Sequence, residues 1–91
     1  MENLNFGDAI KALKEGKKVA RQGWNGKGMF LYYVWADRYP AKTEAAKSIA
    51  DHDGTVPYGA YIAMKTVDGT VIPWLASQTD MLSEDWIILE D

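Results

Sequence analysis

The dipeptide Asp68-Gly69, set between two strand-like segments, constrains the fold of this chain more than any other feature. Residues 60–67 and 70–75 contain several β-branched and aromatic side chains. An Asp-Gly pair between two such segments is typical of a β-hairpin with a type I′ turn. Pro73 donates no backbone hydrogen bond, so the second strand should bend there or lie at the edge of its sheet. The sequence therefore predicts an antiparallel sheet built from hairpins.

Three more segments have the composition of strands, namely residues 17–22, 29–36 and 85–90. The first two are separated by a turn punctuated by glycines, and we expect them to form a second hairpin. Trp24 lies at the tip of this hairpin, where so large a residue is unusual. Together with the first hairpin, these segments bring the expected number of strands to five.

Residues 5–16 have the pattern of an amphipathic helix, with Asn5 suited to cap its first turn. Its apolar face consists of Phe6, Ala9, Ile10 and Leu13. Shorter helices are expected at residues 43–50 and after Ser77, where the Asp80 carboxylate can complete the cap. The expected fold is therefore α+β. It has a small antiparallel sheet of about five strands, an N-terminal helix and one or two further short helices.

The whole chain, residues 1–91, is expected to form a single ligand-binding domain. Residues 37–58 change in composition toward Ala, Lys, Asp and Pro, with turn chemistry at Asp53-Gly54. We interpret this segment as a variable excursion within the domain, not as a linker between two domains.

The chain has more apolar side chains than a domain of its size needs for a core. A domain of this length buries only about 60–65% of the surface that its unfolded chain exposes. Here 47% of the residues are hydrophobic, among them four Trp, and there are five Tyr. We expect the surplus to line a subunit interface or a ligand cleft, and therefore expect a homo-oligomer.

The residue inventory argues against several classes of protein. The chain has no Cys and one His, so it cannot form a Cys-His pair and lacks the ligand spacing of a metal cluster. The single His also argues against a Ser-His-Asp site. His52 lies between Asp51 and Asp53, where a solvated position is expected. A net charge of −3 argues against a nucleic-acid polymer as partner. We therefore expect no enzymatic activity, no metal and no cofactor.

No segment approaches the roughly 20 apolar residues of a membrane span, and the N-terminal residues lack the apolar run of a signal peptide. The absence of Cys is consistent with a cytosolic setting. We therefore expect a soluble, cytoplasmic protein without a membrane partner.

Trp24 is a candidate for ligand binding because of its neighbours. Arg21, Asn25 and Lys27 surround it with hydrogen-bond donors, and its indole offers a flat stacking surface. A site for a nucleobase and a phosphate needs such a stacking surface with hydrogen-bond donors around it. The alternative is that Trp24 packs on the sheet as an ordinary core aromatic, and this motif alone does not decide between the two.

Trp74 repeats the combination, since it follows Pro73 and precedes the polar start of a helix. That start consists of Ser77, Gln78, Thr79 and Asp80. Helix capping and a buried Trp74 are the alternative explanation. Two aromatic residues with polar neighbours at irregular backbone favour a ligand cleft. Trp86 is expected in the core, and Trp35 in the core or at an interface.

Several stretches of the sequence are distinctive. They are Asn5-Phe6-Gly7-Asp8-Ala9, Lys17-Lys18-Val19-Ala20-Arg21, Gly23-Trp24-Asn25-Gly26-Lys27-Gly28-Met29, Met64-Lys65-Thr66, Asp68-Gly69-Thr70, Pro73-Trp74-Leu75-Ala76-Ser77-Gln78-Thr79-Asp80-Met81-Leu82 and Glu84-Asp85-Trp86. They resemble the Thoeris anti-defence type two family, which occurs in phages and prophages and was long known as a domain of unknown function. The resemblance covers nearly the whole chain except about residues 35–58.

The resemblance implies a non-catalytic sponge. Such a protein binds the cyclic ADP-ribose isomer made by a bacterial TIR-domain protein and so blocks Thoeris defence. The resemblance also implies a homotetramer, assembled as a dimer of dimers, with ligand near the subunit interfaces. Phe6, Trp24 and Trp74 are then expected to surround the adenine. Polar contacts to riboses and phosphates are expected from Arg21, Asn25, Gln78, Thr79 and Asp80. Residues 37–58 match no family pattern, so the preferred ligand can differ.

Two other functions remain open at the level of sequence. The surplus aromatic residues can instead bind a host protein, which predicts a stable heteromeric complex and no small ligand. Alternatively, Asp80 or Glu84 can act in a small hydrolase of a nucleotide signal, which predicts a chemically altered ligand.

Overall fold

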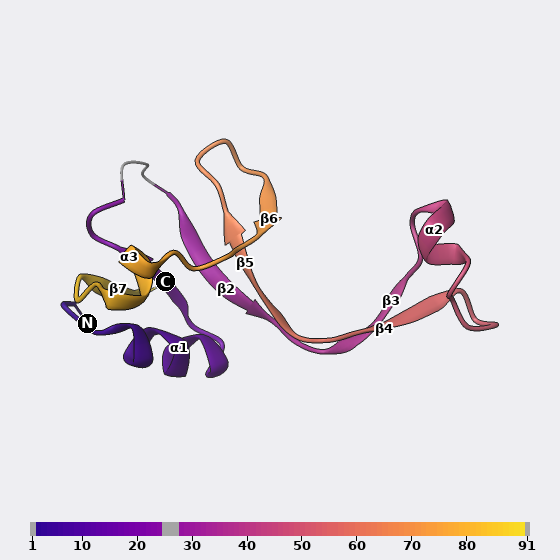
Figure 1. Cartoon of the computed structure of the whole chain (residues 1–91), viewed down its shortest axis with the longest axis horizontal. Coiled ribbons are helices and arrows are strands. Elements are labelled where there is room, and N and C mark those ends of the chain that lie inside the picture. The colour runs from indigo at the N-terminus through magenta and orange to yellow at the C-terminus, as the bar shows by residue number, and fades with distance from the viewer. Residues whose placement is uncertain (1, 25–27, 91) are drawn as a thin grey trace.

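The computed structural model describes residues 2–24 and 28–90, which have the expected α+β fold (Figure 1). A five-stranded antiparallel sheet forms the body, in the order β6-β5-β2-β1-β7. Its strands are β1 (Lys18–Arg21), β2 (Phe30–Val34), β5 (Tyr61–Lys65), β6 (Val71–Pro73) and β7 (Trp86–Leu89). The prediction of five strands is confirmed for this sheet. A second sheet of two strands, β3 (Asp37–Pro40) and β4 (Thr55–Tyr58), was not predicted.

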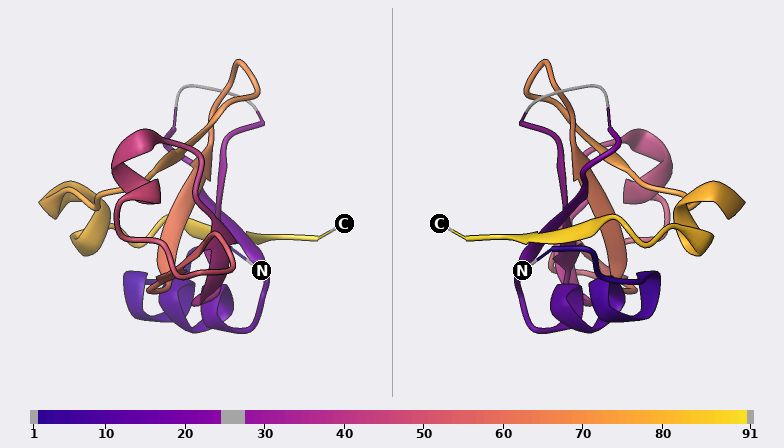
Figure 2. Two further views of the ribbon diagram at one scale, coloured as in Figure 1. Left: turned by 90° about the vertical axis from the view of Figure 1, so that its right-hand side faces the viewer. Right: turned by 90° about the vertical axis from the view of Figure 1, so that its left-hand side faces the viewer.

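The N-terminal helix α1 (Phe6–Lys14) packs along the body of the protein and contacts β1, β2 and β7 (Figure 2). Asn5 caps it as predicted. The Asn5 Oδ1 atom accepts from the Asp8 N–H at 2.8 Å, and Asp8 Oδ2 accepts from the Asn5 N–H at 3.2 Å. This reciprocal capping box satisfies two N–H groups that the helix itself leaves unpaired. The helix therefore begins where the sequence predicts.

The core lies between α1 and one face of the sheet. Val19 is the cross-strand partner of both Leu31 and Ile88, so these side chains lie on one face. Leu31 in turn pairs with Met64. Three buried side chains of α1 pack against this face, namely Ala9, Ala12 and Leu13. Trp86 is fully buried in the same cluster, which confirms its predicted place in the core.

The β5–β6 hairpin forms, but the prediction of a type I′ turn is wrong. Gly69 has a positive φ of 92°, whereas Asp68 does not adopt one. The Thr66 N–H donates to the Thr70 carbonyl at 2.8 Å, so residues 67–69 form the loop. The Asp68 carboxylate accepts hydrogen bonds from both threonine hydroxyls. Asp68 therefore stabilises the turn as an acceptor, and only Gly69 supplies left-handed backbone.

Pro73 lies in β6, which is an edge strand, as predicted from its missing N–H. Helix α3 (Gln78–Leu82) follows, capped by Ser77 and Asp80 as expected. Figure 2 shows β7 running from α3 across the body to the C-terminus on the opposite side. Among the helices described, none is long and apolar enough to cross a membrane.

Residues 37–58 form an arm that stands away from the body (Figure 1). It consists of the paired strands β3 (Asp37–Pro40) and β4 (Thr55–Tyr58), with the short helix α2 (Glu44–Lys47) between them. The predicted helix is present, and Gly54 has the positive φ of 81° that a turn requires. The arm gives the chain a radius of gyration of 15.4 Å. A compact chain of this length would have about 12 Å.

The arm has its own small set of stabilising contacts. Arg38 forms an ion pair with Asp51 and donates from Nε to Thr55 Oγ1 at 3.1 Å. Tyr39 and Tyr58 pack edge to face with ring centroids 5.6 Å apart. These contacts join β3, β4 and the segment after α2.

Candidate functional site

Trp86 is the centre of an aromatic cluster that contains all three predicted adenine walls. Its ring centroid lies 5.6 Å from Phe6, 5.6 Å from Trp24 and 6.1 Å from Trp74. Phe6 and Trp74 also contact each other, at 6.3 Å. We call these four residues the aromatic cluster. The structure therefore brings together three residues that are far apart in the sequence.

Different elements position the three outer rings. Phe6 is the first residue of α1, and Trp24 follows β1 in a turn closed by a 3.2 Å hydrogen bond from its N–H to the Arg21 carbonyl. Trp74 follows Pro73, and its N–H donates to the Ile62 carbonyl at 3.0 Å. All three rings are half-buried against Trp86. Each ring is therefore partly packed against the core and partly exposed to solvent.

Arg21 lies between two carboxylates next to this cluster. Its Nη1 donates to Asp80 Oδ1 at 2.8 Å, and its Nε donates to Asp85 Oδ1 at 2.9 Å. The Arg21 side chain is only 16% exposed. The hydrogen bond to Asp85 and that to Asp80 raise the guanidinium pKa, although burial opposes them. Arg21 thus joins β1, α3 and the start of β7 through one cation.

Both carboxylates are held in the charged form. The Arg21 guanidinium lowers the pKa of Asp85, helped by the Gly23 N–H at 2.9 Å. Burial raises the pKa of Asp80, but hydrogen bonds from Ser77 and Arg21 lower it by more. The Asp80 Oδ2 atom accepts from the Ser77 N–H at 3.0 Å, which closes the cap of α3. Neither carboxyl group is therefore poised to donate a proton at neutral pH.

In the described part of the chain, the other residues predicted to make polar contacts with the ligand form no hydrogen bond with Arg21. Gln78 and Thr79 are exposed on α3, and the Thr79 carbonyl accepts from the Ser83 hydroxyl. Asn25 and its neighbour Lys27 lie outside the described residues. The structure thus joins Arg21 and Asp80 directly and places Gln78 and Thr79 on the same short helix as Asp80.

A pocket of about 280 Å³ opens beside Trp24 and Arg21. It is lined by Ala20, Arg21, Gln22, Trp24, Gly28, Met29, Ile87 and Leu89. Phe6 and Trp74 contribute to the aromatic cluster but not to this pocket. Of the predicted contacts that the structure describes, Trp24 and Arg21 are thus the two that share a cavity.

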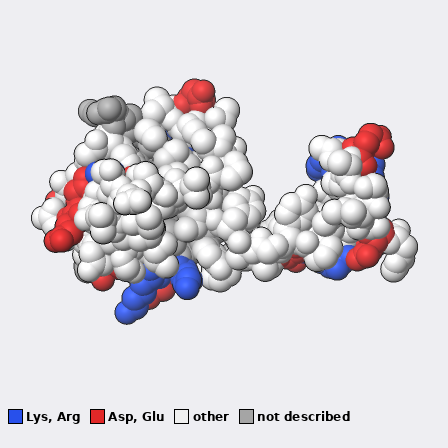
Figure 3. Space-filling view, viewed as in Figure 1, with Lys and Arg blue, Asp and Glu red and all other residues white. Residues whose placement is uncertain are grey.

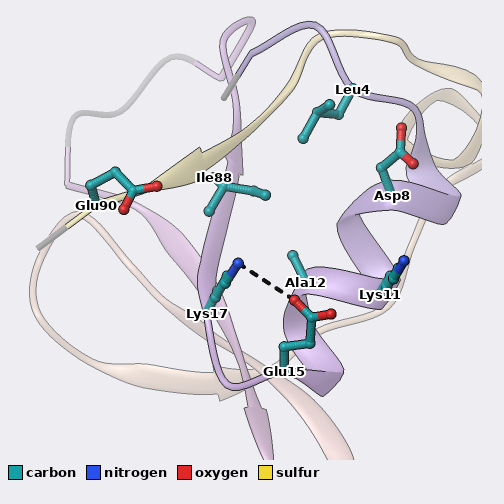
Figure 4. A pocket seen from close by; sticks show the side chains of 8 residues that line it. All are labelled: Leu4, Asp8, Lys11, Ala12, Glu15, Lys17, Ile88 and Glu90. Carbon is teal, nitrogen blue, oxygen red and sulfur yellow. Dashed lines mark ion pairs between the residues drawn. The ribbon is translucent and has the colours of Figure 1, made fainter.

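A second pocket, of about 260 Å³, lies between α1 and β7 (Figure 4). Its rim carries charges of both signs, and Lys17 pairs with Glu15 across it at 3.5 Å. It contains none of the predicted ligand contacts. A broader hollow of about 470 Å³ beside the β5–β6 turn contains none either. The pocket beside Trp24 is therefore the candidate functional site.

Figure 3 shows that the face of the body that carries α3 has few charged side chains. Leu75, before α3, is 90% exposed, and Leu82 at its end is 79% exposed. His52 is exposed on the arm, as expected. Within residues 2–24 and 28–90, no group of three His, Cys, Asp or Glu side chains is arranged to hold a metal ion.

Sequence reasoning missed the roles of Asp85 and Trp86 in this site. The sequence places Asp85 at the start of a strand without a predicted partner, and Trp86 in the core. Their roles depend on the pairing of β7 with β1, which places Trp86 opposite Arg21. The one signal in the sequence is an acidic residue next to a tryptophan at the start of a strand. This signal does not indicate that Arg21 is the partner of Asp85.

Comparison with known proteins identifies a family that covers nearly the whole chain. A family model described as the Thoeris anti-defense 2-like domain matches residues 4–89, a range that includes the arm. The chain is also 37% identical over 86 residues to Thoeris anti-defense 2 of Bacillus phage SP01, with 94% of each chain covered. Both matches support an anti-defence role. The chain belongs to the Thoeris anti-defense 2-like family.

Proposed function

We propose that the protein is a non-catalytic sponge that binds a cyclic ADP-ribose-type signal and thereby blocks Thoeris defence. The observation that carries this proposal is the group of three half-buried aromatic rings around Trp86, with the Arg21 cation beside them. Stacking surfaces and a nearby cation match a ligand that has a purine and phosphates. Family membership supports the anti-defence role of such a site.

Trp24 and Arg21 form the centre of the proposed site because they line the same pocket. Trp24 stacks on the adenine, and Arg21, whose charge is balanced by Asp80 and Asp85, supplies hydrogen-bond donors to a ribose or a phosphate. Phe6 and Trp74 lie outside this pocket, against Trp86, and are proposed as further aromatic walls for the adenine. Riboses and phosphates receive their remaining polar contacts from Asn25, Gln78, Thr79 and Asp80. Of these, the Asp80 carboxylate is suited to accept from a ribose hydroxyl, since it repels a phosphate.

A second copy of the chain completes the site. The pocket beside Trp24 has a volume of about 280 Å³. Pockets that enclose drug-sized ligands have about 300–1,000 Å³, so one chain covers only part of a dinucleotide-sized ligand. The exposed apolar side chains of the α3 face and of the arm supply surface for assembly. The proposed assembly is a homotetramer, built as a dimer of dimers with ligand near the interfaces.

Binding without turnover is favoured by the state of the two carboxylates. A hydrolase requires a group that donates or accepts a proton near neutral pH. Asp80 and Asp85 are instead paired with Arg21, and their pKa values are lowered. Glu84 is exposed. The carboxylates therefore act as hydrogen-bond acceptors that shape the site.

The proposed mechanism is removal of the signal by mass action in the cytoplasm of the host. It requires protein in excess over the signal and a dissociation constant well below the signalling concentration. Each tenfold in affinity corresponds to about 1.4 kcal/mol, and stacking on one aromatic ring contributes about 1–3 kcal/mol per base. Several aromatic walls are therefore sufficient to lower the free signal substantially.

A protein-interaction module is the second candidate function. The exposure of Leu75 and Leu82 on a face with few charges favours it, since such a face can bind a host protein. This alternative predicts a stable heteromeric complex and no heat on addition of a cyclic nucleotide.

The test is isothermal titration of the purified protein with the cyclic ADP-ribose isomer, followed by heat denaturation and chromatography of the supernatant. The sponge predicts tight binding and recovery of intact ligand. Recovery of an altered ligand would show turnover and overturn the non-catalytic assignment. Absence of binding heat at two temperatures would overturn the nucleotide assignment and favour the protein-interaction module.

A further inference from the structure

We propose that Asp85 is a positioning residue, which fixes Trp24 in the orientation that stacks on the ligand. The inference rests on the proposed function, because it assigns a role to Asp85 in that site. Asp85 immediately precedes Trp86 at the start of β7, and it does not line the pocket beside Trp24. It acts through the backbone turn that carries Trp24.

The two carboxylate oxygens of Asp85 have different tasks. Oδ1 accepts from Arg21 Nε at 2.9 Å, and Oδ2 accepts from the Gly23 N–H at 2.9 Å. The Asp85 carbonyl also accepts from the Gln22 N–H at 3.0 Å. Residues 21, 22 and 23 are therefore each held by Asp85. The next residue in the chain is Trp24.

Gly23 is the residue that permits this approach. A Cβ atom at position 23 would lie 2.9 Å from Asp85 Oδ2, closer than a side chain can be accommodated without movement. The carboxylate thus contacts bare backbone. This contact fixes the path of the main chain one residue before Trp24 and leaves the indole to be placed by its own packing.

The indole of Trp24 is placed from the other side by Trp86. The two rings meet edge to face at 79°, with centroids 5.6 Å apart. Trp86 is itself fully buried, and its Nε1 donates to the Asp80 carbonyl at 3.0 Å. Asp85, which precedes β7, holds the backbone before Trp24, and Trp86, the first residue of β7, holds its ring.

Fixing the ring in advance lowers the conformational entropy that is lost when a ligand binds. Without the carboxylate, the turn loses two charge-assisted hydrogen bonds and the indole gains freedom. The free energy of one hydrogen bond to a charged group is large enough that its loss can change the affinity for the ligand about tenfold. We therefore expect Asp85→Ala to weaken binding of the cyclic ADP-ribose isomer about tenfold. Asp85→Asn, which keeps one acceptor oxygen, should weaken it less.

The matched control is Glu84→Gln, because Glu84 is the preceding acidic residue and is exposed. It should bind as the wild type does. A double-mutant cycle with Trp24→Ala, which removes the stacking ring, separates positioning from a general structural role. If Asp85 acts through Trp24, then Asp85→Asn costs less affinity in the Trp24→Ala background than in the wild type. Equal losses in both backgrounds would overturn the proposal.

A second measurement needs no ligand and so does not depend on the proposed function. The indole N–H signal of Trp24 in a ¹H–¹⁵N spectrum is assigned by its loss in Trp24→Phe. In Asp85→Asn it should shift or broaden together with the Gly23 amide signal, while the Trp35 indole signal stays in place. Unchanged Trp24 and Gly23 signals in a folded Asp85→Asn variant would overturn the proposal even if the ligand binds. If the wild type does not bind the cyclic ADP-ribose isomer but these signals shift in Asp85→Asn, only the proposed sponge function would be overturned.

Discussion

Trp86 donates its indole N–H to the backbone carbonyl of Asp80 across 3.0 Å, and this bond ties the buried centre of the aromatic cluster to α3. The same helix residue reaches Arg21 through its carboxylate. Asp80 therefore contacts both the aromatic part and the charged part of the candidate site. Stability and ligand binding should depend on the same few side chains.

Replacement of Trp86 by Phe tests the centre of the cluster. The smaller ring leaves a cavity and removes the donor to the Asp80 carbonyl, so the free energy of unfolding should fall by about 1–3 kcal/mol. Urea denaturation followed by circular dichroism measures this loss. Trp35→Phe is the control, because Trp35 is 58% exposed, and it should stay within about 0.5 kcal/mol of the wild type. A Trp86→Phe variant as stable as the control would contradict the proposed centre.

Removal of an outer ring tests the stacking walls. Trp24→Ala and Trp74→Ala should each weaken binding of the cyclic ADP-ribose isomer at least about tenfold, because stacking on one ring contributes about 1–3 kcal/mol. Titration calorimetry measures the affinity, and circular dichroism shows that each variant is folded. Trp24→Phe keeps a π face and should retain most of the affinity. Wild-type affinity in a folded Trp24→Ala variant would exclude Trp24 as a wall.

Local signals in the sequence predicted the local structure. The Asn5 and Ser77 caps are present because a capping box depends on residues three apart in the chain. The five-stranded sheet was predicted from hairpin turns and strand composition. The predicted turn type at Asp68 was wrong. The Asp68 carboxylate accepts hydrogen bonds from two threonine hydroxyls, and composition alone does not show this contact.

Contacts between residues far apart in the sequence were not predicted. The arm strands β3 and β4 enclose a helix and a turn, and their composition lacks the alternation of a half-buried sheet. The pairing of Asp85 with Arg21 joins residues 64 positions apart. Sequence placed Arg21 and Asp80 together in one site through a family resemblance. Only the fold shows that they contact each other.

Acid should destabilise the protein through Asp80 and Asp85. Both have a pKa below the ordinary carboxyl value in the folded state, so between the folded and unfolded pKa values the folded protein binds fewer protons than the unfolded chain. Their stabilising contribution is complete above about pH 4 and is lost as the pH falls through the lower folded pKa. Urea midpoints measured from neutral to acidic pH should show this fall. In Asp85→Asn the fall should be smaller, and an equal fall would assign the effect to other carboxyl groups.

The arm should contribute to assembly through Ile49, which follows α2 and is 68% exposed in the single chain. A side chain this exposed contributes little to the stability of one chain, so Ile49→Asp should leave folding intact. If the arm is buried between copies, however, the new carboxylate must lose its hydration in the interface, which weakens association. Light scattering after size-exclusion chromatography should therefore show a smaller mass for Ile49→Asp than for the wild type. His52→Asp adds a similar charge to the arm at an exposed polar position and should keep the wild-type mass. Equal masses for all three proteins would exclude Ile49 from the interface, and a reduced mass for both variants would indicate charge repulsion in place of apolar contact.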